Sequence, residues 1–256
     1  MAAASAMFIE LGSRRREERA DKASDVKEII WRMKMPEEIP WPFSRLYDRY
    51  ANRALVKWFR QIAKDIKDRQ ISGIVLDIGT GPGRLPLEIA KQVRNVEVVG
   101  IDISEDMVRI AKKNAEKEGL TDKVRFKVAS AYNTGFEDSS VDLVVSTAVI
   151  HHLRKPLNAF DEIYRVLKPR GEAWLYDIRM DATKAEIEET VRSLNMEEDL
   201  PLPLWIIRII LHRLHVGLKT EVYTSGAIGR ALKESLFGNY QLKEEGAYLR
   251  TILRKT

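Results

Sequence analysis

The stretch from Ile74 to Gly83 (IVLDIGTGPG) constrains the fold more than any other part of the sequence. Its first three residues are apolar, the pattern expected of a β-strand that is covered on both faces. Gly79, Gly81 and Gly83 then allow sharp backbone turns and a close approach to a bound molecule. Residues 85–93 predict a helix whose N-terminal amides point at that molecule.

A second strand indicates what kind of molecule this is. Residues 96–101 (VEVVGI) lead into Asp102, 19 residues after Gly83. An acid at the tip of the second strand is placed to accept hydrogen bonds from the two hydroxyls of a ribose. The dinucleotide fingerprint needs a glycine where Arg84 stands, and the Gly-Lys-Ser/Thr of a phosphate-binding loop is absent. The two motifs therefore predict a nucleoside-containing cofactor other than a dinucleotide.

Strand and helix patterns alternate from residue 71 onwards, which predicts an α/β fold with a mostly parallel, doubly wound sheet. Ser104 is the expected N-cap of one helix and Gly119 its expected end. We expect strands at 73–78, 96–101, 123–128, 141–147 and 172–178, helices at 84–94, 104–118, 156–167 and 224–237, and a final pair of strands at 240–244 and 248–253.

The segments LDIGTGPG (76–83) and GIDIS (100–104) resemble the class I S-adenosylmethionine-dependent methyltransferases. The segment FSRLYDRYA (43–51) resembles small-molecule methyltransferases related to the quinone-biosynthesis enzymes. This resemblance covers roughly residues 44–178 and 224–256. It implies a seven-stranded sheet with an antiparallel C-terminal hairpin, an N-terminal helical extension and a helical lid insertion.

The resemblance also implies how the chain is divided, within one domain overall. The expected parts are an N-terminal helical cover at 1–70, a cofactor-binding core at 71–178 and 224–256, and a helical lid at 179–223.

The cofactor that the resemblance implies is S-adenosyl-L-methionine. Asp77 and the glycines would hold its methionine part, and Ile103 and Met107 would lie against the adenine, although core packing is the alternative for Met107. Ser130 stands where relatives carry an acid that contacts the adenine, and its hydroxyl offers one hydrogen bond without a charge. The expected cofactor-binding residues are Asp77, Gly79, Thr80, Gly81, Gly83, Asp102, Ile103, Met107, Ser130, Ala131 and Ser146.

Methyl transfer from a sulfonium requires few catalytic side chains, because the donor is already activated. The displacement depends mainly on positioning the reactants and on excluding water. Residues 141–153 resemble the strand and loop beside the transferred methyl group. His151 and His152 in this loop are candidates for a catalytic or substrate role, or for a structural one. Side chains of neighbouring residues diverge and no third ligand stands at a metal spacing, so we expect no metal site.

Tyr47 is the third catalytic candidate. By resemblance, a tyrosine near the start of the cover helix faces the site, so Tyr47 and Tyr50 are expected to contact the substrate. Packing between helices is the alternative for both tyrosines.

The insertion is the part least like the family. Residues 204–218 predict a strongly apolar helix, on which Arg208 and His212 share one basic stripe. Three interpretations stay open: a solvated face of a core helix, a pocket wall that contacts an anionic or apolar substrate, and a surface for peripheral membrane binding or self-association.

Composition limits the function further. The 256 residues include no cysteine, which excludes disulfides, thiolate metal sites and the cysteine adduct used to methylate C5 of a pyrimidine. No stretch approaches the 18 apolar residues of a membrane span, and the N-terminus lacks the charge order of a secretory signal, so we expect a cytoplasmic protein. Abundant Lys, Arg and Glu are typical of a thermophile.

The net charge of +5 lies entirely in residues 1–70, which hold 16 basic and 11 acidic residues. The acids are interspersed among the bases, which favours a solvated helical surface over an arm that binds RNA or an anionic membrane.

Together these patterns predict S-adenosylmethionine-dependent methyl transfer to a small molecule that is apolar or anionic. Two alternatives stay open: a membrane-associated lipid methyltransferase, and a non-catalytic cofactor-binding or interaction protein, which the departures at Ser130 and Arg170 allow. There is no strong signal for nucleic acid, and the accepting atom (O, N, S or C) is left open.

Overall fold

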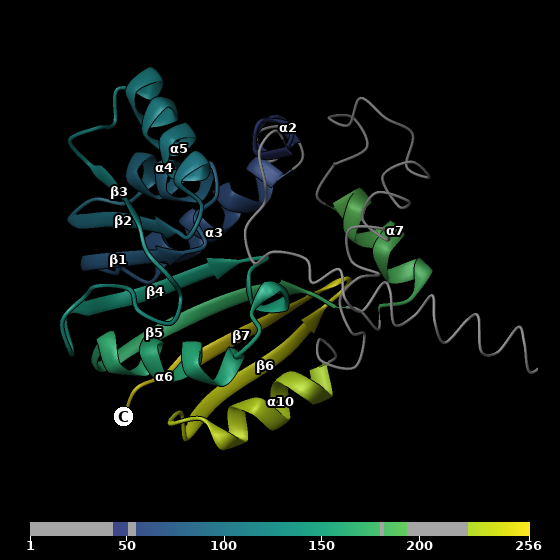
Figure 1. Cartoon of the computed structure of the whole chain (residues 1–256). Helices are drawn as coiled ribbons and strands as arrows, with labels where there is room; N and C mark the ends of the chain where they lie inside the picture. The colour runs from purple at the N-terminus through teal and green to yellow at the C-terminus, as the bar shows by residue number, and fades with distance from the viewer. Residues whose placement is uncertain (1–42, 51–54, 180–181, 194–224) are drawn as a thin grey trace, which may run out of the picture.

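The computed structural model of the chain describes residues 43–50, 55–179, 182–193 and 225–256, and its seven strands form one sheet (Figure 1). The strand order is β3-β2-β1-β4-β5-β7-β6. Strands β1 to β5 pair in parallel, and β7 pairs antiparallel with both β5 and β6. This confirms the predicted mostly parallel sheet with its antiparallel C-terminal hairpin. The strands are β1 Gly73–Ile78, β2 Val96–Asp102, β3 Val124–Val128, β4 Val141–Thr147, β5 Leu167–Ile178, β6 Asn239–Glu245 and β7 Tyr248–Arg254.

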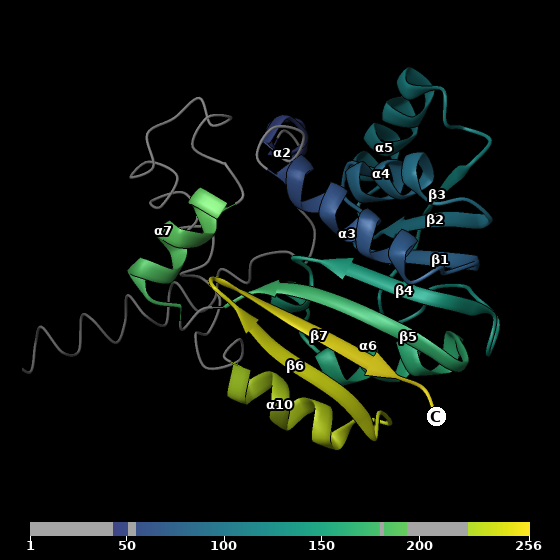
Figure 2. The ribbon, with the colours of Figure 1, turned by 180° about the vertical axis from the view of Figure 1, so that it is seen from behind.

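Helices cover both faces of the sheet (Figures 1 and 2). Successive strand residues point to opposite faces, so Val75 packs in the apolar cluster beneath α3, α4 and α5, and Leu76 packs in the cluster beneath α6 and α10. The described helices are α2 Phe43–Tyr50, α3 Val56–Asp68, α4 Arg84–Gln92, α5 Glu105–Glu118, the short 3-10 helix η2 Ile150–His152, α6 Pro156–Val166, α7 Lys184–Ser193 and α10 Ser225–Glu234.

Two local predictions are corrected. Strand β5 begins at Leu167 rather than 172, because Leu167 already pairs with Val141 before the register shifts. Within this irregular stretch Arg170 has a φ of 67° and donates its N–H to the Lys255 carbonyl (3.0 Å). Ser104 occupies the N-cap position of α5, but its side chain makes no capping hydrogen bond.

Helix α7 is the described part of the predicted lid. The Thr190 hydroxyl accepts a hydrogen bond from the Ala247 N–H (2.8 Å), and Arg179 forms an ion pair with Glu186 (3.0 Å). The first contact fastens α7 to the turn between β6 and β7, and the second fastens it to the residue that follows β5. The division of the chain into cover, core and lid stays a prediction.

The order of the strands reverses beside β1, which pairs with β2 on one side and with β4 on the other. In sheets of this kind a crevice opens at the carboxyl ends of the two strands where the order reverses. The glycine turn follows β1 directly, so the fold places it at this crevice.

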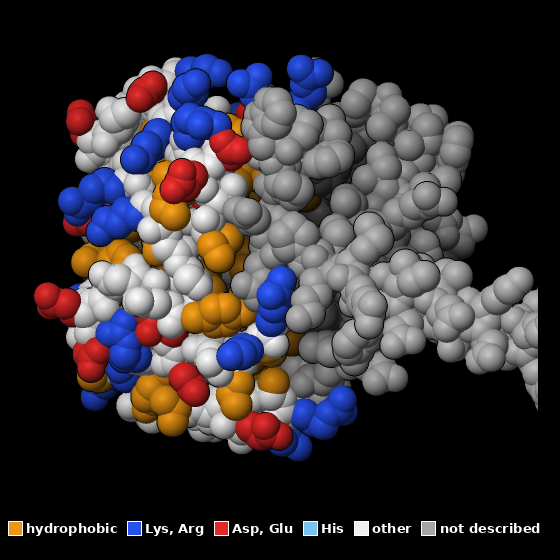
Figure 3. All heavy atoms as spheres, in the orientation of Figure 1, with side chains coloured by type: hydrophobic (Ala, Val, Ile, Leu, Met, Phe, Trp, Pro, Cys, Tyr) orange, Lys and Arg blue, Asp and Glu red, His pale blue; other side chains and the backbone are white. Residues whose placement is uncertain are grey.

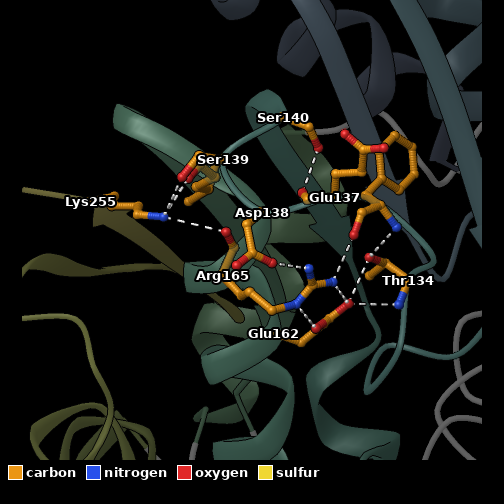
Figure 4. A network of polar contacts seen from close by, with 10 residues as sticks. Thr134, Glu137, Asp138, Ser139, Ser140, Glu162, Arg165 and Lys255 are labelled. Carbon is orange, nitrogen blue, oxygen red and sulfur yellow. Dashed lines mark hydrogen bonds and ion pairs between the residues drawn. The ribbon is translucent and has the colours of Figure 1, made fainter.

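A charged network fastens the loop between β3 and β4 to α6 (Figure 4). Glu162 Oε1 accepts hydrogen bonds from the N–H and the hydroxyl of Thr134 and from Arg165 Nη2, each at 2.8 Å. Arg165 also donates to the Phe136 carbonyl (2.9 Å) and to Asp138 (2.6 Å). The network therefore orders the segment that follows Ser130 at the crevice.

We expect the Glu162→Gln variant to be less stable than wild type by about 1–3 kcal/mol at pH 7. Burial alone would raise the pKa of Glu162, but hydrogen bonds from Arg165 and Thr134 outweigh it and hold the pKa below its ordinary value. The ionised carboxylate therefore stabilises the fold above that ordinary value, and its contribution is lost as the pH falls through the lowered pKa. Urea unfolding at pH 7 and at pH 4 measures both effects.

Asp138→Asn is the control, because this exposed carboxylate pairs with the same arginine. A surface pair of this kind contributes at most about 1 kcal/mol. Equal losses in the two variants, or a Glu162→Gln deficit that does not shrink at low pH, would contradict the role assigned to Glu162.

Candidate functional site

The turn after β1 requires its glycines. Gly79, Gly81 and Gly83 have φ values of 71°, 52° and 78°, as the sequence predicted. The N–H groups of Gly79 and Thr80 donate to the Ile101 carbonyl (2.8 and 2.9 Å), which ties the turn to β2. A Cβ on Gly79 would stand 2.3 Å from Val149 Cγ2, in the loop after β4.

We expect Gly79→Ala to destabilise the protein by at least about 2 kcal/mol, because it adds left-handed backbone strain to a steric overlap. Gly229 lies inside α10, and a Cβ there meets nothing within 4 Å. Gly229→Ala is therefore expected to stabilise the protein by about 0.5–1 kcal/mol. Urea unfolding of both variants measures the contrast, and changes of the same sign would count against this account of the turn.

Asp102 joins the glycine turn to the start of α5. Its Oδ2 accepts a hydrogen bond from the Gly81 N–H (2.8 Å), and its Oδ1 accepts one from the Ser104 N–H (2.9 Å). Each carboxylate oxygen has capacity for a further donor. Asp102 can therefore order the turn and still accept a hydrogen bond from a ligand hydroxyl, the role predicted for it.

Two buried polar atoms beside the turn lack hydrogen-bond partners among the described residues. They are Asp77 Oδ1 and the Thr80 hydroxyl oxygen. Burial raises the pKa of Asp77 to about 7, and the negative charge of Asp102 adds to this rise. A buried carboxylate oxygen without a partner is costly, so this arrangement indicates a place where a cationic or hydrogen-bond-donating group of a ligand binds.

Two apolar side chains are exposed at the carboxyl ends of β2 and β3, at the same edge of the sheet. Ile103 is 44% exposed. Val128, the last residue of β3, pairs with Asp102 and is 51% exposed. Met107 is buried, which favours the core-packing alternative for this residue. Val128 was not predicted as a site residue, although its position at the end of β3 was a signal that could have pointed to it.

Ser130 and Ser146 use their hydroxyls locally. Ser130 Oγ accepts a hydrogen bond from the Tyr132 N–H (3.2 Å), which shapes the turn after β3, with Ala131 half-buried beside it. The buried Ser146 hydroxyl donates to the Ile78 carbonyl (2.9 Å) and so links β4 to β1 at the crevice. Cofactor contacts by Ser130, Ala131 and Ser146 stay predictions.

The two adjacent histidines do not diverge as the sequence analysis assumed. Their ring centroids are 4.0 Å apart, with the planes tilted by 40°. His151 is buried, its Nδ1 lies 2.5 Å from Asp177 Oδ1, and its N–H donates to Asp177 Oδ2 (3.0 Å). Asp177 therefore fixes the orientation of the His151 ring, an arrangement that serves either a base or a structural link. Among the described residues there is no cluster of three or more metal-ligating side chains.

The remaining substrate candidates fall outside what the structure describes. The backbone of Tyr47 and Tyr50 belongs to α2, but their side chains are outside the described part. Arg208 and His212, with the whole of 204–218, lie outside the described residues.

A group of polar contacts between α2 and the glycine turn, which the sequence did not predict, forms a polar clasp. Asp48 Oδ1 accepts hydrogen bonds from Arg84 Nη2 (2.9 Å) and from Asn114 Nδ2 (3.1 Å). Asn114 Nδ2 also donates to the carbonyl of Pro82, inside the turn (2.9 Å). These contacts connect the described part of the N-terminal cover to the loop that it was predicted to close over.

A glycine turn and an acid at the reversal point of a mostly parallel α/β sheet define a Rossmann-like protein that binds a nucleoside-containing cofactor. A family model described as "Methyltransferase domain" matches residues 72–233, well over half of the chain. The chain belongs to the class I S-adenosylmethionine-dependent methyltransferase family, whose cofactor is S-adenosyl-L-methionine.

The chain is also similar in sequence to individual methyltransferases. The chain is 34% identical over 139 residues to the ubiquinone/menaquinone biosynthesis C-methyltransferase UbiE of Rickettsia felis, covering 51% of this chain and 56% of that protein. It is 35% identical over 136 residues to the demethylmenaquinone methyltransferase of Thermus thermophilus, covering 50% and 60%. The matches thus span less than two thirds of the length of these curated relatives.

Among solved structures, the chain resembles a protein of Methanococcus maripaludis proposed to be an S-adenosylmethionine-dependent methyltransferase. The TM-score is 0.66 and the identity 24%, with 86% of this chain and 96% of the other covered. At this identity the likeness supports the fold alone.

Proposed function

We propose that the protein transfers the methyl group of S-adenosyl-L-methionine to a small-molecule acceptor. The observation that carries the proposal is the buried, unpaired Asp77 oxygen beside a glycine turn that Asp102 holds in place. The methionine part of the cofactor carries an ammonium group, which is the kind of partner that a buried carboxylate needs.

The other described residues at this edge fit the rest of the cofactor. Asp102 would accept hydrogen bonds from the ribose hydroxyls, and the exposed side chains of Ile103 and Val128 would cover the faces of the adenine. The Ser130 hydroxyl offers the adenine edge a neutral hydrogen bond. When bound, the cofactor supplies an activated methyl group.

The chain's own contribution is then to position the acceptor and exclude water. Helix α2, clasped to the glycine turn through Asp48, forms one wall of such an enclosure. Where the acceptor loses a proton, His151 is the first described candidate for a base, since Asp177 fixes its orientation. Tyr47, Tyr50, Arg208 and His212 remain the proposed contacts to the acceptor.

The names of the relatives suggest which acceptors to test first. One curated relative is named for ubiquinone/menaquinone biosynthesis and the other as a demethylmenaquinone methyltransferase, so we infer that quinone precursors are the leading class of acceptor. No helix among the described residues has the length and apolar character to cross a membrane. None of the comparisons supports a lipid methyltransferase or a non-catalytic binder.

A methyl-transfer screen tests the proposal. The purified chain is incubated with S-adenosyl-L-methionine labelled in its methyl group, first with quinone precursors and then with fractions of a metabolite extract. We expect labelled product and an equal amount of S-adenosylhomocysteine, and neither with the Asp77→Asn variant. Tight cofactor binding without S-adenosylhomocysteine from any fraction would instead favour the non-catalytic alternative.

A further inference from the structure

A pocket lies between α2 and α5, apart from the glycine turn. It has a volume of about 310 Å³, and no glycine of the turn lines it. Asn114 separates the two, because it lines the pocket and donates a hydrogen bond to the Pro82 carbonyl of the turn. Five cationic side chains line this pocket: Arg45, Arg49, Arg109, Lys113 and Lys117.

Most of these cations are not neutralised. Within the described ranges, Arg45, Arg49, Lys113 and Lys117 form no ion pair with an acid, and Arg109 pairs with Asp106. The single acid in the lining, Asp48, is already engaged by Arg84. Figure 3 shows lysine and arginine side chains gathered at the top of the face, over the region of α5.

The pocket between α3 and α4 provides a contrast. It is larger, about 490 Å³, and also basic. There, however, Arg60 and Lys91 pair with Glu88, and Lys64 pairs with Asp68. A basic lining alone therefore does not mark a binding site in this protein. The pocket between α2 and α5 differs from this one because most of its cations are not paired with an acid among the described residues.

A second observation points to a ligand in the pocket between α2 and α5. Ser44 belongs to its lining and is fully buried, and its hydroxyl oxygen has no hydrogen-bond partner among the described residues. A buried hydroxyl without a partner costs free energy unless a ligand or water supplies one. Ser44 therefore adds a neutral donor to the surrounding cationic ones.

We propose that this pocket binds a phosphate group. A phosphate offers several charged acceptor oxygens, which suit cationic donors that converge from two helices together with a hydroxyl. S-Adenosylmethionine carries no phosphate, so the ligand is a different molecule. It is either a free phosphate compound or the headgroup of an anionic lipid. Bound there, the phosphate joins α2 to α5 and so holds the cover helix in place, whatever reaction the protein catalyses.

The test compares two double variants of the full chain with the same change in charge. Lys113→Glu/Lys117→Glu alters the pocket, whereas Lys112→Glu/Lys123→Glu alters exposed residues on or just after α5 that do not line it. The probes are pyrophosphate, measured by calorimetry, and vesicles of phosphatidylglycerol or phosphatidylcholine, measured by flotation, both at 150 mM salt so that distant charges are screened.

We expect wild type to bind pyrophosphate or the phosphatidylglycerol vesicles, with at least a tenfold loss in the pocket variant and less than a twofold loss in the control. Binding of pyrophosphate alone identifies a free phosphate compound, and binding of phosphatidylglycerol vesicles alone identifies a lipid headgroup. Equal losses in the two variants, or binding of neither probe by wild type, would overturn the proposal. Circular dichroism establishes that both variants are folded, and this outcome does not depend on methyl transfer.

Discussion

Replacing Asp102 with alanine is expected to weaken S-adenosyl-L-methionine binding at least about 100-fold, as two charge-assisted hydrogen bonds would suggest. The carboxylate has two tasks. It accepts hydrogen bonds from the N–H groups of Gly81 and Ser104, and it is the proposed acceptor for the ribose hydroxyls. Alanine removes the ribose contact and also releases the turn that the cofactor approaches. Calorimetry with S-adenosyl-L-methionine measures the loss.

A pair of isosteric variants separates charge from shape. Asp102→Asn keeps one carbonyl oxygen, so we expect an intermediate loss of about tenfold. Asp106→Asn removes the same charge in the first turn of α5, where the carboxylate pairs with Arg109 and not with the glycine turn, and should leave affinity within twofold. If Asp102→Ala bound as tightly as wild type, the cofactor would not occupy this edge.

Asp77→Asn is expected to make the unliganded protein more stable at pH 8, by at most about 4 kcal/mol, while abolishing cofactor binding. The pKa of Asp77 is raised to about 7 in the fold, above the value in an unfolded chain. The folded state therefore holds the extra proton between about pH 4 and 7, and stability falls as the pH rises through that interval. Asparagine does not titrate, so the variant avoids this loss. Urea unfolding at pH 4 and pH 8 measures the difference.

Cofactor binding should show the opposite dependence on pH. Only ionised Asp77 pairs with an ammonium group, so wild-type affinity should rise by up to about tenfold per unit as the pH approaches 7 from below, and then level off. The asparagine variant should lack this dependence. A variant that is less stable than wild type at pH 8, yet binds the cofactor normally, would show that Asp77 is an ordinary structural residue.

The sequence predicted the sheet and its carboxyl edge because both depend on local pattern. Each buried strand is a short apolar run, and Gly79 sits where a left-handed backbone meets the side chain of Val149. The acid at the end of β2 follows from the register of β1 with β2, which places Asp102 within reach of the Gly81 N–H. Each signal is a run of neighbouring residues, so each could be recognised before the pairing of the strands was known.

What the sequence could not supply are pairings between distant residues. Asp48 and Asn114 form a hydrogen bond although they stand 66 positions apart, and Glu162 and Thr134 do so at 28 positions. No repeat or spacing in the sequence predicts either contact. The close approach of the His151 and His152 rings likewise accompanies a contact between distant residues, that of His151 with Asp177 on the next strand. The register shift in β5, where Leu167 pairs with Val141 and Glu172 with Leu143, is also visible only in the pairing of the two strands.

The place of β7 in the sheet has a consequence for how the chain is made. This strand lies inside the sheet, between β5 and β6, and its Arg254 bonds to Glu172 across 82 positions. During synthesis β1 to β5 can pair with one another as they emerge, but β5 keeps an open edge until β7 has left the ribosome. Open strand edges recruit other chains. Ribosomes that stall within the last strand should therefore display a nearly complete sheet that is prone to aggregate, and a chaperone would be needed most at that point.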